Sequence, residues 1–133
     1  MSNALYPSYK QLLLGAGLNL TSLTIKAALV DTGVTAYSSA HDNYDDISSA
    51  VIGTPVTLSG KTVTGGVFDS STNPSFTGLT SAPTIEAVVL YYDSGTPSTS
   101  TLIAWIDTAT GLPVASGATQ VDVTWDATGI FAL

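Results

Sequence analysis

Residues 84–92, TIEAVVLYY, and residues 101–107, TLIAWID, decide the fold of this chain. Apart from Glu86, both stretches are apolar on both faces of the strands that they predict. Strands of this kind lie in the middle of a sheet, where neighbouring elements cover both faces. The residues between them, DSGTP at 93–97, are typical of a turn. We therefore predict two central strands at these positions.

The flanking sequence predicts further, more polar strands. Apolar and polar residues alternate in Leu23–Val30 and in Gln120–Trp125, which is typical of strands with one buried face. Ser59-Gly60 predicts a hairpin turn, and Gly65-Gly66 predicts a bulge inside the second strand of that hairpin. The remaining expected strands are Val51–Leu58, Lys61–Phe68, Asn73–Thr77 and Ile130–Leu133.

These strands lie about ten residues apart and are separated by turns rich in Gly, Pro, Asp and Ser. Residues Ala36–Ser49 form the most polar stretch, which we interpret as a long loop with at most one helical turn. We expect a mainly β fold, an antiparallel β-sandwich of about seven or eight strands, in which two half-apolar sheets bury each other.

One short helix is predicted near the N-terminus. Leu5, Tyr9, Leu12 and Leu13 follow helical spacing, Pro7 suits a first turn, and the glycines at 15 and 17 end the pattern. A helix of this length needs a surface to pack on. We therefore divide the chain into an N-terminal arm, residues 1–20, and a β-sandwich domain, residues 21–133.

The composition excludes several classes of function. The 133 residues include three lysines, no arginine and no cysteine, and the net charge is −7. Binding to nucleic acid or to an anionic membrane needs more cations, and disulfides and thiolate chemistry need cysteine. Charged residues make up 10% of the chain, against about 25% in ordinary soluble domains. Serine and threonine replace them, which favours permanent contact with other protein.

Targeting and membrane segments are not evident. The first residues, MSNALYPSYK, lack the basic start and continuous apolar run of a signal peptide, and no stretch has the roughly 20 apolar residues of a membrane span. We therefore expect the protein to be made and kept in a cytoplasm, or to be assembled there into something larger.

Three candidate catalytic or metal sites each have a simpler interpretation. His41, the single histidine, would need a positioned serine and an oxyanion hole to form a triad, and is otherwise a solvated loop residue. The acids Asp42, Asp45 and Asp46 lie as close together as Ca²⁺ ligands do, but also suit an acidic loop or the start of a helix. Glu86 is a buried acid, a partner of Lys26 or Lys61 on a neighbouring strand, or a residue that reaches an interface.

Five aromatic residues form the last candidate site, a platform for sugar rings: Tyr37, Tyr91, Tyr92, Trp105 and Trp125. The apolar neighbours of both tryptophans favour core positions instead. From the residues alone we expect no catalytic residue, no bound cofactor and no metal.

Six segments, which cover most of the chain in order, resemble a family of small virion proteins of tailed bacteriophages. The most specific are LSGKTVTGGVFD, from Leu58, and LIAWIDTATGLPV, from Leu102. The other segments are Asn3–Tyr6, Thr24–Thr32, Glu86–Thr96 and Val123–Leu133. The resemblance implies a capsid cement (decoration) protein that binds the outer surface of the major capsid protein shell, forms a dimer or trimer with itself, and stabilises the particle without catalysis.

Within this interpretation, we expect the segment Ser2–Leu14 to bridge to a neighbouring subunit. The expected contact residues are Leu5, Tyr6, Leu12 and Leu13. Two alternatives stay open: a tail or fibre module that binds host glycans through exposed aromatic residues, and a small hydrolase centred on His41.

Overall fold

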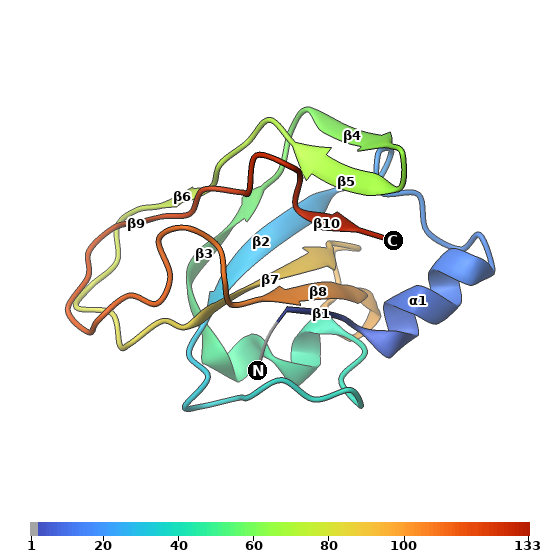
Figure 1. Cartoon of the computed structure of the whole chain (residues 1–133). Coiled ribbons are helices and arrows are strands. Elements are labelled where there is room, and N and C mark those ends of the chain that lie inside the picture. The colour runs from blue at the N-terminus through green and yellow to red at the C-terminus, as the bar shows by residue number, and fades with distance from the viewer. Residues whose placement is uncertain (1–2) are drawn as a thin grey trace.

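The computed structural model of the chain, which describes residues 3–133, is mainly β (Figure 1). Its largest sheet has five strands in the order β1–β8–β7–β2–β3, and every neighbouring pair is antiparallel. The strands of this sheet are β1 (Ala4–Leu5), β2 (Ile25–Val30), β3 (Val51–Thr57), β7 (Ala87–Tyr92) and β8 (Leu102–Ile106). Together with two smaller antiparallel sheets, it confirms the predicted β-sandwich-like class.

The two predicted central strands are β7 and β8, and they pair directly. Val88 lies opposite Ile106, Val89 opposite Trp105, and Leu90 opposite Ala104. All five residues of β8 and the first five of β7 are buried. Because neither strand has a polar face, both must be covered on two sides, and the rest of the chain supplies the cover.

The second sheet has three strands, in the order β10–β5–β4, and its hairpin differs from the prediction. β4 (Lys61–Thr64) pairs with β5 (Val67–Ser70), and β5 pairs with β10 (Phe131–Ala132). Gly65 and Gly66, predicted as a bulge, form the hairpin turn, with φ of +60° and +80°. Two residues with positive φ are what a type I′ hairpin turn requires.

The predicted hairpin at Ser59-Gly60 was therefore wrong. β3 pairs with β2 of the large sheet, where Val51 lies opposite Val30 and Thr57 opposite Lys26. The main chain after Thr57 crosses from one sheet to the other, so Ser59-Gly60 is a connection between sheets.

The third sheet contains only β6 (Ser75–Phe76) and β9 (Val121–Asp122). The predicted alternation is confirmed here, because Val121, Val123 and Trp125 are buried whereas Asp122 and Thr124 are exposed. The indole N–H of Trp125 donates to the main-chain oxygen of Thr72 at 2.7 Å, which satisfies its buried polar atom.

The helix α1 spans Pro7–Leu14 and begins with Pro7 in its first turn, as predicted. Leu5, which was assigned to the helical pattern, belongs instead to β1. Within the helix only Tyr9 is fully buried. The predicted loop at 36–49 contains the 3₁₀ turn Tyr44–Asp46, and a second one, Ser48–Ala50, follows; a third, Pro97–Thr99, connects β7 to β8.

Between residues 3 and 133, no helix has both the length and the apolar character that crossing a bilayer would require. The one α-helix has eight residues.

We expect shortening Val89 at the centre of the core to be far more costly than shortening an exposed valine. Val89 is fully buried, so Val89→Ala should lower the free energy of unfolding by about 2 kcal/mol or more, through lost burial and the cavity left behind. The matched control is Val34→Ala, because Val34 is 59% exposed; it should change stability by about 0.5 kcal/mol or less. Urea unfolding of both variants measures the difference, and equal losses would contradict the central position of β7.

Candidate functional site

The N-terminal strand β1 is an edge strand of the large sheet of its own chain. Ala4 lies opposite Trp105 and Leu5 opposite Ala104. The main-chain N–H of Tyr6 continues the pairing with a hydrogen bond of 3.0 Å to the oxygen of Ile103. This pairing crosses the predicted division between residues 1–20 and 21–133.

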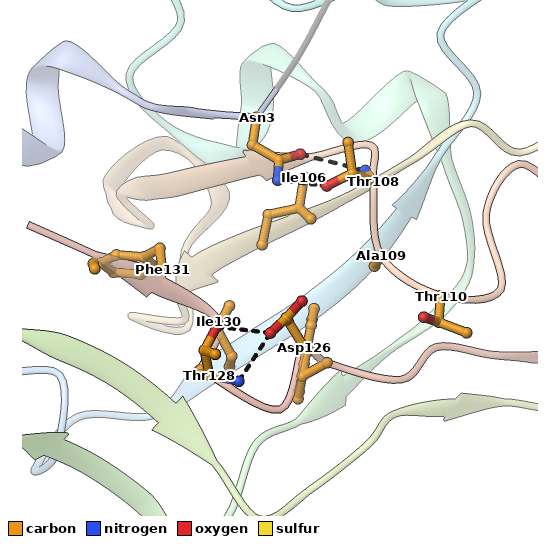
Figure 2. A pocket seen from close by; sticks show the side chains of 12 residues that line it. Asn3, Ile106, Thr108, Ala109, Thr110, Asp126, Thr128, Ile130 and Phe131 are labelled. Carbon is orange, nitrogen blue, oxygen red and sulfur yellow. Dashed lines mark hydrogen bonds between the residues drawn. The ribbon is translucent and has the colours of Figure 1, made fainter.

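Asn3 fastens the start of this strand to the turn after β8 (Figure 2). Its Oδ1 accepts hydrogen bonds from the N–H of Asp107 at 2.8 Å and of Thr108 at 3.3 Å. Its Nδ2 donates to Oγ1 of Thr108 at 2.7 Å. One side chain thus joins two segments more than 100 residues apart in the sequence.

The structure places the four predicted contact residues differently. Tyr6 is fully buried in its own chain, so its side chain is not on the surface of the monomer and that part of the prediction is corrected. Leu5 and Leu13 are half-buried, and Leu12 is 37% exposed. Ser2, the first residue of the predicted bridging segment, lies outside the described residues, and contact of the other leucines with a second chain stays a prediction.

Tyr6 belongs to an aromatic cluster under β1. Its ring centroid lies 5.3 Å from that of Tyr37, which lies 5.9 Å from that of Trp105. Burial, and then the nearby Tyr37 and Asp46, raise the pKa of Tyr6 well above its ordinary range. The phenol therefore stays neutral and acts as a packing group.

A polar cleft of about 250 Å³ lies beside Asn3, between the turn after β8 and the segment that leads to β10 (Figure 2). Thr108, Thr110 and Thr128 contribute hydroxyls to its lining. Asp126 also lines it, but its Oδ1 accepts hydrogen bonds from the N–H and Oγ1 of Thr128, at 2.8 and 2.7 Å. These bonds lower the pKa of Asp126, so the carboxylate stabilises its own turn.

An apolar groove of about 410 Å³, which we name the helix groove, lies between α1 and the sheet β10–β5–β4. Tyr9 and Leu13 come from the helix, Val63 and Phe68 from the β4–β5 hairpin, and Leu133 from the C-terminus. The other residues that line it are Ala16, Leu18, Asn19, Leu20, Thr21, Gly66 and Phe131. None of these side chains is charged.

Two of the exposed apolar side chains line the helix groove. The large apolar residues exposed among residues 3–133 are Leu12, Leu14, Val34, Val63 and Leu133. Val63 and Leu133 line the groove, whereas Leu12 lines a separate cleft with Ser8 and Gln11. The sequence analysis did not identify this surface. The signals for it in the sequence were Leu13, within the run Leu12–Leu14, and the apolar C-terminal residues.

His41 shows no triad geometry. It is half-buried rather than fully solvated, and its Nδ1 has no hydrogen-bond partner in the described part of the chain. Its main-chain N–H donates to the oxygen of Ser38 at 3.2 Å. No serine or carboxylate therefore orients the Nδ1 of this imidazole, as a general base requires.

The acidic loop forms a cap. Oδ2 of Asp46 accepts hydrogen bonds from the N–H of Asp42 at 2.8 Å and of Asn43 at 3.4 Å, at the start of the turn Tyr44–Asp46. The interpretation of this stretch as the carboxylate-stabilised start of a helical turn is confirmed. Among residues 3–133, no group of three or more His, Cys, Asp or Glu side chains lies close enough together to hold a metal ion.

Glu86 pairs with neither lysine that was expected to contact it. Its Oε2 accepts a hydrogen bond of 2.9 Å from the N–H of Thr32. This hydrogen bond stabilises the turn after β2. Lys26 instead forms a 2.7 Å ion pair with Asp93, and the ammonium group of Lys61 donates to the main-chain oxygen of Leu23. The prediction was wrong because a carboxylate next to a turn finds main-chain donors locally.

The aromatic residues considered for sugar binding are mostly core residues. Trp105, Trp125 and Tyr91 are buried, and Tyr37 and Tyr92 are half-buried. The interpretation of both tryptophans as core residues is confirmed. Burial of both tryptophans argues against a platform on which a sugar ring would stack.

Comparison with known proteins adds no further guidance. No family model, no curated protein and no solved structure matches the chain. The resemblance to virion proteins therefore stays a prediction, and function must be argued from the surface and its chemistry.

We expect Asn3→Ala to loosen the N-terminal strand. The substitution removes an acceptor of two main-chain N–H groups and a donor to Thr108, so it should lower the free energy of unfolding by about 0.5–1.5 kcal/mol. Amide hydrogen exchange in Ala4–Tyr6 should become faster. A double-mutant cycle with Thr108→Val isolates the side-chain pair, and strict additivity of the two losses would show that this hydrogen bond contributes nothing.

We expect the Asp46 cap to be lost in acid. The N–H groups of Asp42 and Asn43 lower the pKa of Asp46, so its stabilising effect is complete above the ordinary carboxyl pKa of about 4 and disappears as the pH falls through the lowered value. Asp46→Asn should therefore reduce the drop in unfolding free energy between about pH 6 and about pH 3. The effect should be small, because Asp46 is exposed.

The control for this experiment is Asp45→Asn in the same turn. The Asp45 carboxylate accepts no hydrogen bond among residues 3–133, so this variant should keep the pH dependence of the wild type. If Asp46→Asn also keeps that dependence, the cap does not act as described.

Proposed function

We propose that the chain is a non-enzymatic structural protein of a tailed-phage virion, a capsid cement protein that associates with itself and stabilises the shell of major capsid protein from outside. One observation carries the proposal: a charge-poor chain has an apolar groove without charged side chains, lined in part by the exposed side chains of Val63 and Leu133. Contiguous exposed apolar surface of this kind marks contact with other protein.

The polar groups that catalysis would use have structural roles instead. Glu86, Asp46 and Asp126 each accept main-chain hydrogen bonds within turns. The Nδ1 of His41 has no carboxylate or serine partner among the described residues. This pattern supports a protein that works by binding, since acid–base chemistry needs groups that are free to exchange protons with a substrate.

The low charge also suits assembly on a lattice. Burying a charged side chain in an interface costs desolvation free energy, and only 10% of this chain is charged. Many copies on one shell multiply modest contacts through avidity. The glycan-binding alternative has less support, because both tryptophans that would stack on sugar rings are buried.

The test is to locate the protein on purified virions and to measure its effect on the shell. Antibody labelling should mark the outside of the head, and adding the protein to shells that lack it should raise the temperature at which they open. Labelling of the tail, or no effect on the shells, would overturn the proposal.

A matched variant separates binding from catalysis in the same assay. His41→Gln removes the single imidazole of the chain and leaves the groove residues in place. It should stabilise the shells as well as the wild type does, because no proton transfer is involved. Loss of stabilisation in a folded His41→Gln protein would favour a chemical role for the histidine.

A further inference from the structure

Strand β4 presents an open edge next to the helix groove. It is the last strand of its sheet, and among residues 3–133 it pairs with β5 alone (Figure 1). Its residues Thr62, Val63 and Thr64 are all exposed. An open edge of this kind can extend the sheet by pairing with a strand from another chain.

The hydrogen-bond pattern of the hairpin shows which main-chain groups face the open side. The N–H of Ser71 donates to the oxygen of Gly60 at 3.2 Å, which makes Lys61–Ser70 a non-hydrogen-bonded pair. Pairs alternate along an antiparallel ladder, so Val63–Phe68 is of the same kind. The N–H and C=O of Lys61 and Val63 therefore point away from β5.

Other edges are less suited to pairing. The edge strands β1 and β10 have two residues each, and β3 contains Pro55, which has no N–H to donate. A lysine on an edge usually discourages pairing, but the ammonium group of Lys61 is bound to the main-chain oxygen of Leu23. β4 is thus four residues long, and its one charged side chain is held by a main-chain oxygen of its own chain.

Charge favours the same face for contact between two copies. Two chains with a net charge of −7 repel each other, and the repulsion is weakest where the faces that meet carry no acidic side chain. No acidic side chain lines the helix groove. Asp69 lies opposite Thr62, and Val63 lies opposite Phe68. Because side chains alternate along a strand, Asp69 projects from one face of the sheet, and Val63 and Phe68 project from the opposite face.

We propose that a second copy of this chain pairs with β4 in an antiparallel manner about a two-fold axis at Val63. Groups that face outward must meet their equivalents, so Val63 lies opposite Val63 of the second copy, Thr62 opposite Thr64, and Lys61 opposite Gly65. The two three-stranded sheets become one six-stranded sheet, and the two lysines do not face each other.

The helix groove enlarges this contact. A standard interface uses about 20–30 residues on each side, more than four residues of strand provide. Val63 belongs to both surfaces, so pairing along β4 brings the second copy against the rim of the groove, where Leu133 and the end of α1 add apolar area. The inference rests on the self-association in the proposed function and names its surface.

The test is the molar mass of the full chain in solution, measured by analytical ultracentrifugation over a range of concentrations. The wild type should be a dimer that dissociates on dilution. Val63→Asp places two carboxylates opposite each other at the axis and should weaken the dimer about tenfold or more. Its control is Val34→Asp, the same change at a valine that is 59% exposed and does not line the groove; it should leave the dimer intact.

Hydrogen exchange gives a second readout that needs no substitution. The Val63 amide should exchange slowly in the dimer and quickly in dilute protein, whereas the Thr62 amide, which is bonded to β5, should be protected in both. A wild type that stays monomeric or forms a trimer, or a Val63→Asp protein as dimeric as the wild type, would overturn the inference. None of these three results bears on shell stabilisation, which is measured separately.

Discussion

The pairing of β7 with β8 is the constraint on which the rest of this structure depends. Two strands without a polar face cannot be left against water on either side, so each needs a cover above and below. The aromatic cluster under β1 contacts Trp105 of β8, and β2 continues the sheet beyond β7. The small sheets and α1 then contribute the remaining apolar side chains to the same core.

The central strands could be predicted because their signal is local: nine consecutive residues with one charge leave no other placement. The position of the hairpin turn could not be predicted, because Ser59-Gly60 and Gly65-Gly66 are both acceptable turns in isolation. The choice between them depends on the pairing of β3 with β2, and the paired residues lie more than 20 positions apart in the sequence. Non-local pairing of this kind leaves no periodicity to detect.

The candidate site illustrates the same limit. The expected contact residues included Leu13, which lines the groove, but also Tyr6, which its own chain buries. An apolar pattern shows that a side chain will be covered, not which chain covers it. The helix groove itself combines α1, the loop after it, the β4–β5 hairpin and the C-terminus, so no single stretch of sequence contains its outline.

The scarcity of charge connects the fold to the proposed role. The carboxylates of Asp46 and Asp126 accept hydrogen bonds within their own turns, which keep them ionised and hold them in place, and the chain carries few other charges to direct a partner. Contact then depends on shape, main-chain hydrogen bonds and apolar area. A dimer joined through β4 would carry two copies of each remaining surface of the chain. When one copy binds a repeating shell, the effective concentration of the second copy at a neighbouring site rises. Weak individual contacts are then sufficient, because the lattice and the dimer together supply the affinity that each surface lacks.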